Sequence, residues 1–231
     1  MVVKEIWVTR HGFREDWINP NTTSPTGLGY DSPLSKSGRK QTRELCNYLM
    51  DKDIQVVYSS PFYRVLETVT PLVMENHIPH YLENALAEWY GKDVDYRKPA
   101  PSDVLKHLFP HLDLSHDTID LPTGRESVVC CHERAERGMH KLITQLDEEN
   151  KYERILLVGH AASVICVIRA LLRESSFPVR VGTASLSRLV RKEDGTWELK
   201  ENGDCHYLSE GEQRPWTFSG DVPDYTYKNA L

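Results

Sequence analysis

The sequence contains little cysteine for its 231 residues, and its cysteines show no pairing pattern. They are odd in number and form no C-x-x-C motif: Cys46, Cys130, Cys131, Cys166 and Cys205. Such a set disfavours the disulfide framework of a secreted domain and favours a reducing compartment. The chain also begins without a basic stretch followed by a long apolar one. We therefore expect no signal peptide and a nuclear or cytoplasmic location, or both.

Long apolar runs and an excess of positive charge are missing as well. The longest apolar stretches, residues 155–158 and 161–168, are far shorter than the ~20 residues that a membrane-spanning helix needs. We therefore predict no association with a membrane. Acidic residues outnumber basic ones and give a formal net charge of -6. Because this charge disfavours a broad surface for nucleic acid, we predict no direct nucleic-acid binding, and any anion site must be local.

The sequence does contain a regular alternation of short apolar runs and amphipathic stretches. The apolar runs predict strands at residues 6–9, 56–59, 80–82 and 154–159. The amphipathic stretches predict helices at 35–50, directly after 60–61, at 126–149 and at 161–172, and a hairpin joins 185–191 to 196–200. Ser35 and Ser60 are expected to cap the first two helices. This order is typical of a largely parallel sheet covered on both faces, within one domain spanning residues 1–231.

Two segments depart from this alternation. Residues 91–123 gain proline and histidine and lose periodicity, so we interpret them as an excursion off the core that forms a lid. Residues 19–33 form a loop rich in Asn, Pro, Thr and Gly. Because binding specificity commonly resides in loops, we expect substrate selection to depend on these two segments.

Cationic and imidazole side chains stand where three predicted strands end. Arg10 and His11 follow the first strand, Arg64 lies one turn into the helix after the second, and His160 follows a later strand. The carboxyl ends of parallel strands meet at one edge of a sheet, where ligands bind. Positive groups gathered there beside helix N-termini predict an anion site that suits phosphate, and Arg14 is placed to add a bidentate contact.

The same residues carry a family resemblance. Thr9-Arg10-His11-Gly12, Ser59-Ser60-Pro61 with Arg64, Glu88-Trp89-Tyr90 and Val158-Gly159-His160-Ala161 resemble, in order and spacing, the histidine phosphatase superfamily, also called phosphoglycerate mutase-like. The resemblance implies a three-layer α/β/α sandwich with a mostly parallel central sheet. It also implies that His11 is the nucleophile and Glu88 the proton donor. We therefore assign His11, Glu88 and His160 as catalytic, and Arg10, Arg14, Arg64 and Ala161 as phosphate-binding.

Phosphoryl transfer places specific demands on these groups. Arginines neutralise the phosphoryl oxygens, and their charge keeps the His11 imidazole unprotonated and nucleophilic. No metal or cofactor is then required. Glu88 must carry a proton for the leaving group, so burial against Trp89 is expected to raise its pKa despite the cations around it. We accordingly predict an acidic-to-neutral pH optimum for hydrolysis of a phosphorylated small molecule or phosphoprotein.

A narrower resemblance points to an assembly. Residues 10–14 with Trp17, 60–69, 160–163 and 208–212 resemble the phosphatase domain of a fungal subunit of TFIIIC, the RNA polymerase III transcription factor. This likeness implies other TFIIIC subunits as partners. It leaves an alternative open, a weakly catalytic or non-catalytic interaction module. Phosphoglycerate mutase activity is less favoured, because Phe13 and Arg14 replace the polar pair that mutases carry after Arg-His-Gly.

Overall fold

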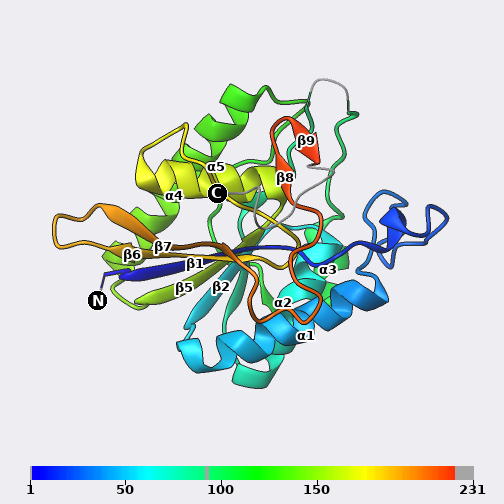
Figure 1. The fold of residues 1–231 in the computed structure, drawn as a ribbon, viewed down its shortest axis with the longest axis horizontal. Helices are drawn as coiled ribbons and strands as arrows, with labels where there is room; N and C mark the ends of the chain where they lie inside the picture. The colour runs from blue at the N-terminus through cyan, green and yellow to red at the C-terminus, as the bar shows by residue number, and fades with distance from the viewer. Residues whose placement is uncertain (1, 92–93, 222–231) are drawn as a thin grey trace.

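The computed structural model describes residues 2–91 and 94–221, so the ends of the predicted domain and two residues of the predicted lid lie outside it. Within the described part, a seven-stranded sheet has the order β4-β3-β2-β5-β1-β6-β7 (Figure 1). Its strands are β1 (Glu5–Arg10), β2 (Val56–Ser59), β3 (His80–Leu82), β4 (Leu112–Asp113), β5 (Arg154–Gly159), β6 (Leu186–Arg191) and β7 (Trp197–Asp204). Strands β1 to β5 pair in parallel, whereas β6 and β7 run antiparallel at one edge.

Helices cover both faces of this sheet, and three short 3-10 turns link the elements. The helices are α1 (Lys36–Leu49), α2 (Tyr63–Asn76), α3 (Ser102–Leu108), α4 (Val128–Glu149) and α5 (Ala161–Leu172). The turns are η1 (Glu15–Trp17), η2 (Met50–Lys52) and η3 (Asn84–Leu86). Helices α1 and α2 lie on one side of the sheet, and α4 and α5 on the other, as Figure 1 shows. No helix among the described residues has the length and apolar character to cross a bilayer.

The pleat of the central strands divides the core into two clusters. Ile6 and Val8 of β1 pack in the cluster formed with α4 and α5, whereas Trp7 between them packs in the cluster formed with α1 and α2. Successive side chains of a strand point to opposite faces, so a continuous apolar run supplies both cores at once. The fold is therefore the predicted α/β/α sandwich with a mostly parallel sheet.

The predicted cap of the first helix is confirmed, and that of the second is wrong. The Ser35 hydroxyl accepts a hydrogen bond from the Gly38 amide at 2.9 Å. The Ser60 backbone instead continues the ladder, because its amide donates to the Val158 carbonyl. Helix α2 consequently begins at Tyr63, whose amide donates to the Asp31 carboxylate at 3.1 Å. The capping acceptor of α2 therefore comes from Asp31 in a distant loop and not from Ser60, which is near in sequence.

Part of the segment 91–123 does not leave the core. It contains α3 and β4, and β4 extends the sheet by pairing in parallel with β3. Leu105 and Leu112 are fully buried in a third apolar cluster beside α2. The expected excursion is therefore wrong for residues 102–113. A seven-residue helix and a two-residue strand are too short to produce a readable hydrophobic period.

Candidate active site

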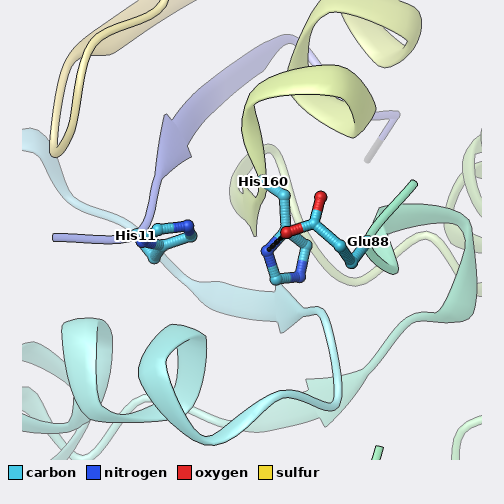
Figure 2. A group of neighbouring side chains, drawn as sticks. All are labelled: His11, Glu88 and His160. Carbon is cyan, nitrogen blue, oxygen red and sulfur yellow. Dashed lines mark ion pairs between the residues drawn. The ribbon is translucent and has the colours of Figure 1, made fainter. Parts of the chain in front are cut away.

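The three predicted strand ends meet at one edge of the sheet. Strands β2, β5 and β1 are neighbours in this order and run parallel, so their carboxyl ends lie side by side. His11 follows β1, and His160 follows β5 and precedes α5, with ring centroids 5.3 Å apart. Figure 2 shows the two imidazoles facing a common space, with Glu88 directed at His160 from the opposite side. The structure thus brings together residues separated by up to 149 positions.

His11 presents one defined nitrogen to this space. Its Nδ1 lies 2.8 Å from the Gly12 carbonyl oxygen, which can only accept a hydrogen bond. Nδ1 therefore carries the ring proton, and Nε2 keeps its lone pair. Burial lowers the pKa of His11 well below its ordinary 6.5, and the charges of Arg64 and Arg10 lower it further. The imidazole is consequently neutral near pH 7, the form in which Nε2 is nucleophilic.

Arg64 is the central cation of the site. Its side chain is almost completely buried, and its Nη2 lies 2.9 Å from Glu88 Oε2 and 3.1 Å from His160 Nδ1. Its Nη1 lies 3.5 Å from Asp31 Oδ1, and Asp31 is fully buried. The carboxylates of Glu88 and Asp31 therefore balance a guanidinium that water cannot reach. An anion that binds here competes with Glu88 for Arg64.

The expected rise in the pKa of Glu88 is wrong. Burial does work against ionisation, but hydrogen bonds and charge from His160 and Arg64 outweigh it, so the pKa lies well below 4.5. Trp89, which follows Glu88, packs instead against Trp216 and Phe218 of the tail. Negative charge placed beside Glu88 would raise this pKa, because it disfavours the ionised carboxylate.

His160 and Ala161 mark the start of α5. Burial is the main cause that lowers the pKa of His160 to about 4, against the opposing influence of Glu88. Its Nε2 lies 2.8 Å from the Ser60 hydroxyl, which explains why this serine serves the site and not a helix cap. Ala161 is the first residue of α5, where backbone amides lack partners within the helix. Its role toward phosphate stays a prediction.

Sequence reasoning missed a tryptophan surrounded by arginines at the site. The guanidinium carbons of Arg10, Arg14 and Arg214 lie 5.6, 5.3 and 4.6 Å from the Trp17 ring centre. Arg10 Nη1 donates to the Arg214 carbonyl at 2.6 Å. Arg14 is held by the carboxylate of Asp16, and burial lowers its pKa, with a further lowering from the nearby charge of Arg64. No local pattern distinguishes Arg214 from other residues of the tail, so only the fold reveals its position.

A cation and an anion would contact different groups here. Among the described residues, His11, Glu88 and His160 have ligand atoms within 4.8 Å of one another, as metal ligands do. The Arg64 guanidinium, however, already bonds the same carboxylate. A metal ion would have to enter beside this fixed positive charge, which favours an anion over a cation. The absence of a metal requirement remains a prediction.

Mild acid is expected to destabilise the folded protein. The folded pKa values of His11 and His160 lie below their ordinary 6.5, so between these values only the unfolded chain takes up the protons. The free energy of unfolding should therefore fall as the pH drops from 6.5 to 5, by up to about 1.4 kcal/mol per pH unit for each histidine. Urea unfolding across this range measures the slope. In His160→Asn the slope should be shallower; an unchanged slope would contradict the assignment.

The chain matches the family model of the histidine phosphatase superfamily, branch 1, over residues 6–204. It therefore belongs to that superfamily, as the order of its motifs had indicated. Among curated proteins it is similar to the transcription factor tau 55 kDa subunit of Saccharomyces cerevisiae, with 32% identity over 257 aligned residues. The alignment covers 94% of this chain but 59% of the yeast protein, so the chain spans less than two thirds of that relative.

Solved structures share the fold at low sequence identity. The ecdysone phosphate phosphatase of Bombyx mori is 15% identical and gives a TM-score of 0.70, covering 99% of this chain and 100% of that one. YhfR of Bacillus stearothermophilus is 20% identical, with a TM-score of 0.62 and coverage of 88% and 98%. At these identities the likeness establishes a phosphoglycerate mutase-like fold, and the chemistry has to be argued from the residues of the site.

Proposed function

We propose that this protein is a phosphatase that hydrolyses phosphomonoesters through a phosphohistidine formed on His11. The observation that carries the proposal is the 2.8 Å contact between His11 Nδ1 and the Gly12 carbonyl oxygen. The Gly12 carbonyl favours the proton on Nδ1, which leaves Nε2 unprotonated in a site where His160 lies nearby and the charges of Arg64 and Arg10 act on the ring. Arginines placed beside a neutral imidazole suit an attack on a phosphorus atom whose oxygens carry negative charge.

The first step forms a bond between His11 Nε2 and phosphorus and breaks the ester P–O bond. The Glu88 carboxylate contacts Arg64 at 2.9 Å and His160 at 3.1 Å. When the substrate binds, its phosphoryl oxygens replace the carboxylate at these two residues. Glu88 then takes up a proton from solvent beside the dianion and transfers it to the departing oxygen. In the second step Glu88 accepts a proton from water, the water oxygen attacks phosphorus, and the N–P bond breaks to release inorganic phosphate.

Hydrolysis of p-nitrophenyl phosphate tests this proposal. We expect turnover that a chelator does not reduce and that tungstate inhibits competitively. A structural relative, the Bombyx mori phosphatase, was solved with tungstate bound, and this oxyanion should also suit the arginines here. Turnover that disappears with chelator would contradict the mechanism. Binding of tungstate without any turnover would mean a pocket that holds phosphate but performs no chemistry.

A second candidate function is that of a subunit in an assembly. The similarity to the tau 55 kDa subunit supports a place in the RNA polymerase III transcription factor TFIIIC, in contact with its other subunits. Affinity purification of the tagged protein from a nuclear extract tests this role, with recovery of TFIIIC subunits as the expected result. The variant His11→Ala should recover the same subunits if assembly is independent of catalysis. Recovery of none would exclude the assembly role.

Phosphoglycerate mutase activity has less support. Phe13 donates its amide to Gln41 Oε1 and stacks edge-on against Trp17, and Arg14 is held by Asp16. Phe13 is apolar and Arg14 is engaged by Asp16, so neither provides the polar contact that mutases make with the residues after Arg-His-Gly. Activation by 2,3-bisphosphoglycerate is the discriminating measurement, and we expect none.

A further inference from the structure

The proton donor of the proposed reaction lies on irregular backbone. Glu88 follows the short turn η3 and belongs to no strand or helix. A ladder of hydrogen bonds holds the backbone at His11 and His160, because both adjoin β-strands. Another device must fix the segment 84–90, since proton transfer tolerates only small displacements of the donor.

Arg134 of α4 provides contacts of this kind on one side of the segment. Its side chain is 3% exposed, and its Nη1 donates to the backbone carbonyls of Asn84, Ala85 and Ala87 at 3.2, 2.9 and 3.2 Å. Ala87 directly precedes Glu88. One guanidinium nitrogen therefore donates hydrogen bonds to three backbone carbonyls in the turn that directly precedes Glu88.

Glu126 closes the network on the other side. Its carboxylate accepts from Arg134 Nε and Nη2 at 2.8 and 2.7 Å, a bidentate pair that fixes the plane of the guanidinium. Its backbone carbonyl accepts from Trp89 Nε1 at 3.0 Å, and its amide donates to the Tyr90 carbonyl at 2.9 Å. The two residues thus hold the backbone before and after Glu88, whose side chain reaches the site.

Close packing supports the same turn. Gly138 lies one helical turn beyond Arg134 on α4, and a Cβ atom there would stand 2.2 Å from the Ala85 Cβ. Helix α4 therefore approaches η3 closely enough for a short-range network. A flexible contact across a wide gap would not constrain the turn in this way.

We propose that Arg134, together with Glu126, is a positioning residue that holds Glu88 at the reacting oxygen. This inference rests on the proposed phosphatase function. Its consequence depends on the leaving group, because a proton donor matters most when the departing oxygen is strongly basic. The 4-nitrophenolate ion leaves readily without a proton, whereas phenolate depends more on Glu88.

The test compares kcat/KM for phenyl phosphate and p-nitrophenyl phosphate. This parameter covers the steps through expulsion of the leaving group. Arg134→Met should reduce kcat/KM for phenyl phosphate about tenfold more than for p-nitrophenyl phosphate, as Glu88→Gln should. Arg134→Lys, which keeps a charge but not the planar fork, should recover part of the difference. If Arg134→Met does not fold, Glu126→Gln replaces it, with the same preferential loss expected.

A matched control separates positioning from general stability. Arg191 pairs with Asp147 at 2.6 Å and joins β6 to α4 away from Glu88, so Arg191→Met also breaks an arginine–carboxylate pair of this helix. It should leave the ratio of the two kcat/KM values unchanged. Equal losses for both esters in Arg134→Met, with normal turnover by the unsubstituted protein, would overturn the positioning role. No turnover by the unsubstituted protein would overturn the phosphatase proposal itself, and the role with it.

Discussion

Replacing His11 by alanine is expected to reduce kcat/KM for p-nitrophenyl phosphate by about 10⁴-fold or more. The substitution removes Nε2, which is unprotonated because the ring proton lies on Nδ1 beside the Gly12 carbonyl and the pKa is lowered. Water would then have to attack the phosphate dianion directly. The phosphohistidine should also be detectable directly. When a substrate labelled in its phosphoryl group is mixed with the unsubstituted protein and quenched without acid, the label should remain on the protein as an acid-labile, base-stable adduct. In His11→Ala this adduct should be missing.

A second buried histidine provides the control for this experiment. His80 begins β3, is fully buried, and places Nε2 2.7 Å from the Ser59 hydroxyl, much as His160 does with Ser60. His80 begins its strand, and its side chain bonds Ser59 and not His11, Glu88 or His160. His80→Asn should therefore lose stability but keep its kcat/KM. Activity retained in His11→Ala would show that His11 is not the nucleophile.

Arg64→Met is expected to reduce both activity and stability. The loss of a cation that binds the phosphoryl oxygens should lower kcat/KM by about 10³-fold. The same change leaves the buried Asp31 carboxylate and the partly exposed Glu88 carboxylate without their guanidinium. Removal of one partner from a buried pair should lower the free energy of unfolding by about 3 kcal/mol. Steady-state kinetics and urea unfolding measure the two effects separately.

Two further variants distinguish these effects. Adding Asp31→Asn to Arg64→Met removes one unbalanced charge, so part of the stability should return while the activity stays low. Arg39 pairs with Glu67 at 2.7 Å but is half exposed, so Arg39→Met should cost no more than about 1 kcal/mol and spare catalysis. An Arg64→Met protein with normal kcat/KM would contradict the assignment of Arg64 to phosphate binding.

The sequence predicted the elements that contain uninterrupted apolar runs or a clear amphipathic period. Residues 155–158 are apolar because a central parallel strand is buried on both faces, and such a run needs no tertiary information to be recognised. The site followed from the same strands, because His11 and His160 stand directly after two of them. The elements missed, α3 and β4, are short and owe their place to pairing with β3 and packing against α2.

Residue identity and order by themselves determined the fold class, the superfamily and the set of groups at the carboxyl edge of the sheet. Strand direction alone brings the ends of parallel neighbours together, which predicts the residues at that edge, whereas the superfamily followed from the resemblance of the motifs. Only the tertiary structure decided how these groups act on one another. The pKa of Glu88 is a balance between burial and the charges of His160 and Arg64, and its sign depends on distances between residues far apart in sequence. The cap supplied by Asp31 and the network of Arg134 are long-range contacts of the same kind, which no local pattern encodes.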